Sequence, residues 1–280
     1  MDLTNKNYLE INYNDLKKSK DLLEKSKNLQ LTYILIQDFF NEHTVNQILE
    51  ELKNIDNSNF IQYADGYKVF PRTAFSTENK DEEAGIYFNS TYETSRLIKE
   101  FFSIDLISKF HNLFNNINRD VSLLYGPNNN YFNPFNFRIM NDKVGINTTS
   151  NIHNGSSITN RCINSTYKHL VKSIDFDNQL SFFTLLKNCE VGGEITIYSY
   201  PKNDYSILKD KHLLLGFDGL EINLLKTNNK FIISMNPGDL IIFPGGQLWH
   251  RVEPVVEGTR ITLGGFLASD FDNKKWYYWI

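Results

Sequence analysis

Several features that would identify common classes of protein are missing from this sequence. Its two cysteines, Cys162 and Cys189, form no CxxC motif, which excludes a disulfide framework and a cysteine-based zinc site and predicts two free thiols. No apolar run approaches the roughly 20 residues that cross a bilayer, and the first residues are polar where a secretory signal would be apolar. With 29 basic and 33 acidic residues, a net charge of −4 and a pI near 5.9, the chain lacks the basic stripe that nucleic acid binding requires. We therefore expect a soluble, cytoplasmic protein with neither a nucleic acid nor a membrane as partner.

The composition is that of a folded protein. Of the 280 residues, 41% are apolar and 14% are aromatic, so the chain has enough material for a substantial core. At roughly 150 residues per domain, the length permits one large domain or two modest ones. We prefer a single domain over residues 1–280, because helices packed on one side of a double sheet would bury both apolar faces in one core.

The two halves of the chain differ in their apolar periodicity. Residues 1–125 are expected to be mostly helical support, because apolar residues recur at helical spacing from 45 to 55 and from 97 to 117. Within that half, residues 31–36 read as a buried strand. Residues 126–280 carry short β-branched and aromatic runs between glycine turns, which predicts a core made of two sheets. The predicted fold class is therefore α+β.

Polar residues interrupt the predicted strands where a site is expected. His250 follows a strand and a glycine turn, so its imidazole should lie at the mouth of a sheet. In the strand that follows, alternation places Arg260 and Thr262 on one face, where a guanidinium fork and a hydroxyl could both bind a carboxylate. Taken singly, each is commonly a rim or surface residue. Together they favour a dicarboxylate ligand.

A second histidine, His153, lies just before the run of predicted strands. His153 and His250, followed by Arg260, fit a mononuclear iron site that uses 2-oxoglutarate as cosubstrate. Iron oxygenases of that kind use two histidines and a carboxylate as metal ligands. The carboxylate of a His-x-Asp motif is missing here, because Gly155 stands at that position.

In order and spacing, six short motifs resemble the freestanding iron(II)/2-oxoglutarate halogenases of hapalindole-type alkaloids, a family that carries His-x-Gly in place of His-x-Asp. The motifs are Gln179–Phe183, Gly192–Tyr198, Pro237–Asp239, His250–Val252, Gly264–Ala268 and Tyr277–Trp279. The resemblance continues more thinly to the opening strand and helix, so it covers most of the chain. It implies a double-stranded β-helix (jelly-roll) core and a role in natural product biosynthesis. The cofactors that it implies are iron(II), 2-oxoglutarate, O2, and chloride or bromide.

The resemblance also implies how the metal and the oxo acid are bound. His153 and His250 would hold the iron. Gly155, which has no side chain, would leave a metal position open and remove one negative charge, so that a halide can bind the metal. Arg260, helped by Thr262, would anchor the far carboxylate of 2-oxoglutarate.

Further residues match the family at positions around that centre. Ser181 matches a serine that hydrogen-bonds near the metal and favours transfer of halide over transfer of hydroxyl. Arg138 matches an arginine that would contact the oxo acid or the halide, although a structural ion pair is an equal alternative. Val69, Phe70 and Arg72 lie in the region that faces substrate in the family, and Phe70 and Arg72 would suit a substrate with a flat or acidic part.

Three functions remain open at this point. The first is a radical halogenase that acts on an aliphatic carbon of a freestanding small molecule and releases succinate and CO2. The second is a hydroxylase or desaturase on the same scaffold, expected if water takes the open position or if an acid elsewhere reaches the metal. The candidate acids are Glu194, Asp175 and Asp177. The third is a binding module without turnover, against which the intact His153, His250 and Arg260 argue.

Overall fold

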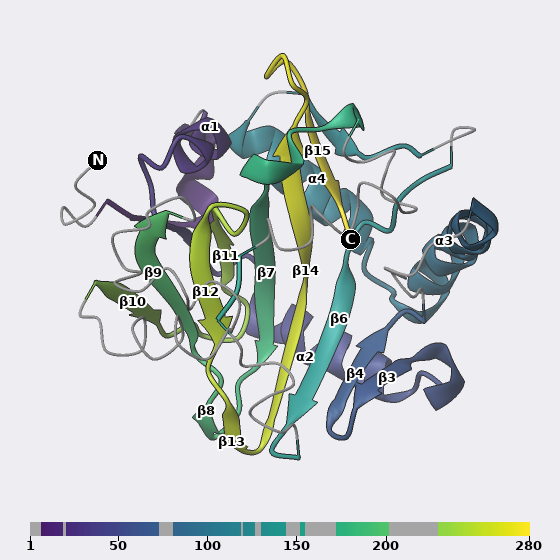
Figure 1. The fold of residues 1–280 in the computed structure, drawn as a ribbon. Coiled ribbons are helices and arrows are strands. Elements are labelled where there is room, and N and C mark those ends of the chain that lie inside the picture. The colour runs from purple at the N-terminus through teal and green to yellow at the C-terminus, as the bar shows by residue number, and fades with distance from the viewer. Residues whose placement is uncertain are drawn as a thin grey trace, which may run out of the picture.

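The computed structural model describes residues 7–18, 21–72, 81–118, 120–126, 130–143, 152–154, 172–201 and 229–280. Ten of the described strands form one large, mainly antiparallel sheet (Figure 1). Its order is β1 (Leu9–Asn12), β2 (Ile34–Gln37), β11 (Leu240–Phe243), β7 (Leu180–Lys187), β14 (Thr259–Ser269), β6 (Asn136–Asn141), β4 (Tyr67–Phe70) and β3 (Ile61–Ala64). Outside this order, β15 (Trp276–Trp279) pairs with β14 and with β5 (Val121–Leu123).

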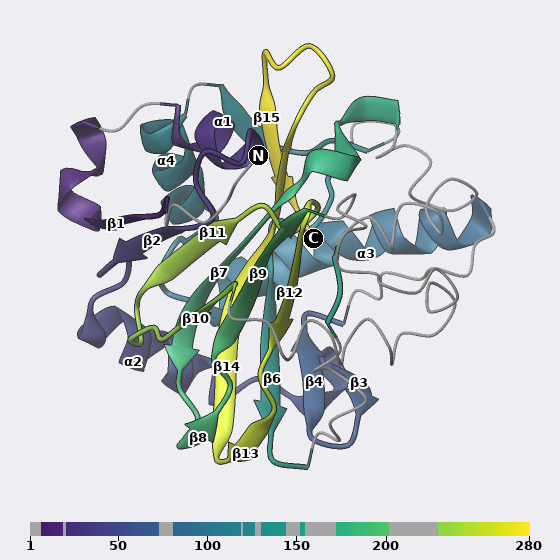
Figure 2. The ribbon, with the colours of Figure 1, turned by 60° about the vertical axis from the view of Figure 1, so that its left-hand side comes forward.

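A smaller sheet lies against one face of the large one. It consists of β10 (Lys230–Ile233), β9 (Ile195–Pro201) and β12 (Leu248–Val252), and a short ribbon of β8 (Val191–Gly192) and β13 (Val255–Glu257) lies below it. Figure 2 shows β9 and β12 in front of β7 and β14, which makes two facing layers. The prediction of an α+β fold with two sheets is confirmed.

Helices cover the opposite face of the large sheet. They are α1 (Leu22–Lys27), α2 (Glu42–Lys53) and α4 (Leu106–Ile117), while the long α3 (Asp81–Phe101) extends to the side (Figures 1 and 2). Three 3-10 turns, Tyr13–Lys18, Asn57–Asn59 and Phe176–Asn178, complete the described helical structure. As predicted from spacing, α2 buries Val45, Ile48 and Leu52, and the side chain of Asn41 caps it by accepting the amide of Thr44 at 2.9 Å.

The alternation of side chains along β7 separates the core from the space between the sheets. Leu180, Phe182 and Leu186 point toward the helices and belong to the main apolar core. The ring of Phe182 packs on Phe110 and Phe114 of α4, with centroid distances of 5.5 and 4.9 Å. The intervening residues of β7 therefore face the small sheet.

The N-terminal part contributes more strands than its periodicity predicted. The strand expected at 31–36 is present as β2, but β1, β3, β4 and β5 also join the large sheet. Each of these four is only three or four residues long, too short for alternation to reveal. The core from Leu16 to Tyr278 is shared by both halves of the chain. No helix in the part of the chain that the structure describes is both long and apolar enough to cross a membrane.

Candidate active site

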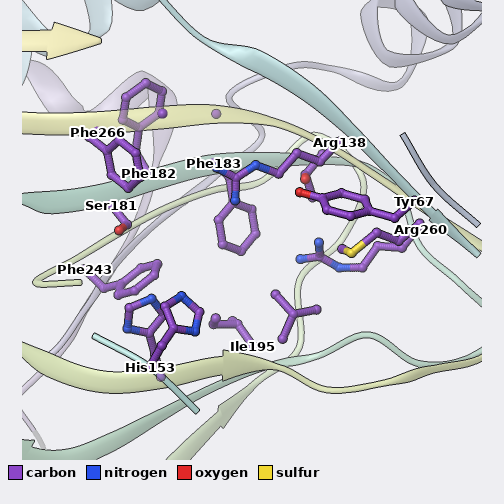
Figure 3. A pocket seen from close by; sticks show the side chains of 16 residues that line it. Tyr67, Arg138, His153, Ser181, Phe182, Phe183, Ile195, Phe243, Arg260 and Phe266 are labelled. Atoms are coloured by element: carbon purple, nitrogen blue, oxygen red, sulfur yellow. The ribbon is translucent and has the colours of Figure 1, made fainter. Parts of the chain in front are cut away.

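A cavity with a volume of ≈ 270 Å³ lies between the two sheets (Figure 3). The large sheet contributes side chains from β4, β6, β7, β11 and β14, and the small sheet contributes side chains from β9 and β12. The charged and hydroxyl-bearing residues that line it are Tyr67, Arg138, His153, Ser181, His250, Arg260 and Thr262. No described lining residue is an aspartate or glutamate, so the cavity carries cationic and neutral groups only.

The backbone brings His153 and His250 side by side. Each amide donates to the carbonyl of the other residue, at 3.0 Å from His153 and at 2.9 Å from His250. The two ring centroids are 4.4 Å apart. His153 is exposed, whereas His250, a residue of β12, is buried with 7% of its surface exposed.

The tautomer of His250 follows from its neighbour. Its Nδ1 lies 3.0 Å from the carbonyl oxygen of Leu248, so Nδ1–H donates there and the lone pair of Nε2 stays available for a metal. Burial and the nearby His153 lower the pKa of His250 to about 3. The ring is therefore neutral, which is the form that binds metal ions.

Arg260 is a buried cation that forms no ion pair with a described carboxylate, although the charge of Glu194 acts on it. The residue is 3% exposed, and its Nε has no hydrogen-bond acceptor. The guanidinium carbon lies 5.1 Å from the ring centroid of Phe183. Burial lowers the pKa of Arg260 to about 10; the Arg138 guanidinium adds to this shift and the nearby Cys189 and Glu194 oppose it, so the group remains charged at neutral pH. Because a buried charge without a counterion is costly, this end of the cavity suits an anion.

The strand β14 presents Arg260 and Thr262 to the cavity as predicted, while Ile261 and Leu263 pack against the helix-side core. Thr262 is 3% exposed and lies opposite Arg138 of β6 in the register of the sheet. Arg138 lines the same cavity, and its Nε donates to Asn136 at 3.2 Å. Its side chain makes no ion pair with a described carboxylate, so the alternative of a structural ion pair has no support among the described residues.

Ser181 of β7 lines the cavity opposite Phe243 of β11. The turn after Phe243 lies directly on this serine, because a methyl group at Gly245 would collide with the Ser181 hydroxyl. Gly155, the residue expected to leave a metal position open, lies outside the described residues.

The structure corrects the predicted substrate contact of Phe70. Its side chain is 0% exposed and packs in the helix-side core, 5.8 Å from Phe137 between ring centroids. Alternation along β4 turns Phe70 away from the cavity. Val69 is buried opposite Arg138, and Arg72 is exposed, and neither is among the described lining residues. From this part of the chain the cavity receives Tyr67 instead.

The three acids that could have completed an iron triad do not line the cavity. Asp175 pairs with Lys27 at 2.8 Å. Ile197 is the partner of His250 in the small sheet. Glu194 lies three positions before Ile197, which places it about 10 Å along the strand from the level of His250. Among the described residues, no group of three His, Cys, Asp or Glu side chains could hold a metal. The histidine pair therefore has no described carboxylate beside it.

Two aromatic residues of the site went unnoticed in the sequence. Phe183 underlies Arg260, and Phe243 packs against the ring of His250 with centroids 4.9 Å apart. Alternation from Ser181 along the same predicted strand was the available signal for Phe183. Phe243 comes into the site through the pairing of β11 with β7, which local sequence does not indicate.

Comparison with known proteins gives a family for the chain and solved structures of similar fold. A model of the carrier-protein-independent halogenase WelO5 family matches residues 5–280, whereas a search of curated proteins found no match. The N-substituted L-amino acid dioxygenase from Burkholderia ambifaria AMMD has a similar structure, with a TM-score of 0.58 at 14% identity over 92% of this chain and 90% of that one. The same dioxygenase in complex with α-ketoglutarate gives 0.57 at 15% identity over the same shares. These structures confirm the jelly-roll core. The chain therefore belongs to the carrier-protein-independent halogenase WelO5 family and is an iron(II)- and 2-oxoglutarate-dependent enzyme.

Proposed function

We propose that this enzyme is a radical halogenase that chlorinates or brominates an aliphatic carbon of a freestanding small-molecule natural product. The observation that carries the proposal is the histidine pair, His153 and His250, in a cavity whose described lining contains no carboxylate. In a facial triad a protein carboxylate occupies one coordination position of the metal, whereas a pair of histidines leaves that position free for a halide. Membership of the halogenase family supports the same conclusion.

The donor set fits iron(II). Two imidazoles on adjacent backbone segments provide cis nitrogen ligands, and the Nδ1–H bond to the Leu248 carbonyl orients Nε2 of His250. Because His250 is neutral, no proton has to be displaced when a metal binds. With O2 and 2-oxoglutarate, iron bound by these two histidines would provide the chemistry that removes a hydrogen atom from an unactivated carbon.

The residues at the other end of the cavity fit 2-oxoglutarate. Arg260 and Thr262 would hold its distal carboxylate. The Nε–H of Arg260 has no acceptor among the described residues, so it can donate to this carboxylate. The cavity volume of ≈ 270 Å³ suits a small ligand of this kind. The Burkholderia dioxygenase of the same fold binds α-ketoglutarate in its solved complex.

Two further side chains would act on the outcome of the reaction. Ser181 presents a hydroxyl to the cavity under the turn at Gly245, where it would orient the reacting centre toward halide transfer. Arg138 adds a second positive charge and would stabilise the halide or the oxo acid. The overall reaction converts substrate, halide, a proton, O2 and 2-oxoglutarate into halogenated product, succinate, CO2 and water.

Product mass tests the proposal. The iron-loaded enzyme is incubated with 2-oxoglutarate, O2 and candidate small-molecule natural products, in chloride, in bromide and in a halide-free buffer. The proposal predicts a product whose mass and isotope pattern follow the halide, together with succinate. A product that gains oxygen or loses two hydrogens in all three buffers would establish the hydroxylase or desaturase instead. The His153→Ala variant is the control and should form neither product nor succinate.

A further inference from the structure

We propose that Phe183 is a positioning residue that holds the Arg260 guanidinium by its ring face and so sets the preference of the enzyme for a 2-oxo acid with a distal carboxylate. The inference rests on the proposed function, in which Arg260 binds that carboxylate. An aromatic side chain, in place of an acid, then orients the Arg260 guanidinium.

Arg260 needs such a partner because, among the described residues, Glu194 attracts its charge but no carboxylate forms an ion pair with it. The structure shows no ion pair between it and a described carboxylate, and its Nε lacks an acceptor. The aliphatic part runs past Gly193, whose φ of +76° and missing side chain leave room: a Cβ there would lie 3.0 Å from Cδ of Arg260. The backbone of Gly193 therefore packs against the stem of Arg260 as far as Nε.

The ring of Phe183 meets the guanidinium itself. The guanidinium carbon lies 5.1 Å from the ring centroid, within the range of a cation–π interaction. In Figure 3 the Phe183 ring lies in the middle of the cavity wall with Arg260 beside it. A ring attracts the cation through its face and leaves the N–H edge unoccupied for a ligand, whereas a carboxylate partner would compete for the same N–H groups.

The surrounding residues hold Phe183 in this orientation. It lies opposite Gly264 in the pairing of β7 with β14, and a Cβ at Gly264 would be 2.5 Å from the Cβ of Phe183, so only glycine permits this approach. On its other side Phe243 packs edge to face at 6.4 Å, and Phe243 in turn packs against His250 at 4.9 Å. A row of rings, Phe243 and Phe183, thus connects His250 to the Arg260 anchor.

The test compares two ligands on three forms of the enzyme. Anaerobic protein loaded with iron(II) is titrated with 2-oxoglutarate, and with 2-oxovalerate, in which a methyl group replaces the distal carboxylate. The metal-to-ligand charge-transfer band reports the binding of either 2-oxo acid. The forms are the wild type, Phe183→Leu, which removes the ring face, and Phe183→Tyr, which retains it. Phe183→Met, which keeps the volume without the ring, is a second variant in case the leucine form fails to fold.

We expect Phe183→Leu to weaken 2-oxoglutarate binding about 2- to 30-fold, while Phe183→Tyr stays close to the wild type. The affinity for 2-oxovalerate should be the same in all three forms, because that ligand makes no use of Arg260. An equal loss for both ligands, or no loss for 2-oxoglutarate, would overturn the positioning role while leaving the proposed function intact. Absence of a band from the wild type would instead refute the proposed function, and the inference with it.

Discussion

Replacing Arg260 by methionine should weaken cosubstrate binding while leaving the ligand-free protein at least as stable. The side chain is 3% exposed, and its Nε makes no hydrogen bond, so the folded protein bears the cost of a buried, unsatisfied donor. Such a group costs about 1–3 kcal/mol, which methionine would relieve while it still packs on the Phe183 ring. Loss of a hydrogen bond to a charged carboxylate costs about 1.5–3 kcal/mol, or roughly 10- to 150-fold in the affinity for 2-oxoglutarate.

Two measurements separate these effects. Chemical denaturation of the ligand-free proteins gives the free energy of unfolding, which should be equal or higher in Arg260→Met than in the wild type. Titration of the iron-loaded proteins with 2-oxoglutarate gives the affinity, which should fall. Arg260→Lys is the matched control, because it keeps a charge but loses the planar fork, and we expect an intermediate affinity. A variant that is destabilised without ligand but binds 2-oxoglutarate like the wild type would refute the assignment of Arg260 as the anchor.

Three further variants test other parts of the structure. Lys27→Met should lower the free energy of unfolding by about 1–3 kcal/mol, because it leaves the partly buried Asp175 without its ion pair. Burial raises the pKa of Asp175, but hydrogen bonds from Asn178 and Lys27 outweigh this effect, so the pKa in the folded protein is lowered from 3.8. In urea titrations, the loss of unfolding free energy in Lys27→Met should therefore be full above pH 3.8 and should disappear as the pH falls through the lower pKa of the folded protein. Gly245→Ala should displace the Ser181 hydroxyl and lower the ratio of halogenated to hydroxylated product by mass spectrometry, and an unchanged ratio would count against the role of Ser181. Phe70→Ala should destabilise the fold by about 3–5 kcal/mol without changing the affinity for 2-oxoglutarate, whereas a selective change in substrate turnover would restore its predicted substrate contact.

The sequence predicted those parts of the site that depend on alternation within one strand. Arg260 and Thr262 share a face of β14, as their spacing required. The helical stripe from Val45 to Leu52 is likewise buried as its period indicated. In each case a local pattern is sufficient, because the geometry of one strand or helix decides which side chains share a face.

The features that the sequence did not predict depend on pairing between distant segments. Phe70 was assigned to substrate by family resemblance, but the register of β4 with β6 places it opposite Phe137 in the core. A shift of one residue would reverse the two faces, and nothing within the strand itself selects the register. The contact between Nδ1 of His250 and the Leu248 carbonyl also depends on pairing. The register of β12 with β9 shifts between Leu248 and His250, and the sequence of β12 alone does not indicate this shift.

The most direct test of the central claim is whether a halide reaches iron held by His153 and His250. Ferrous iron and 2-oxoglutarate are added to the purified protein without oxygen, and the metal-to-ligand charge-transfer band is recorded with and without chloride. The proposed site predicts a visible band that shifts when chloride is added, and that is absent from His250→Ala. A band that chloride leaves unchanged would contradict the halide site and favour the hydroxylase, and absence of any band would contradict the iron site itself.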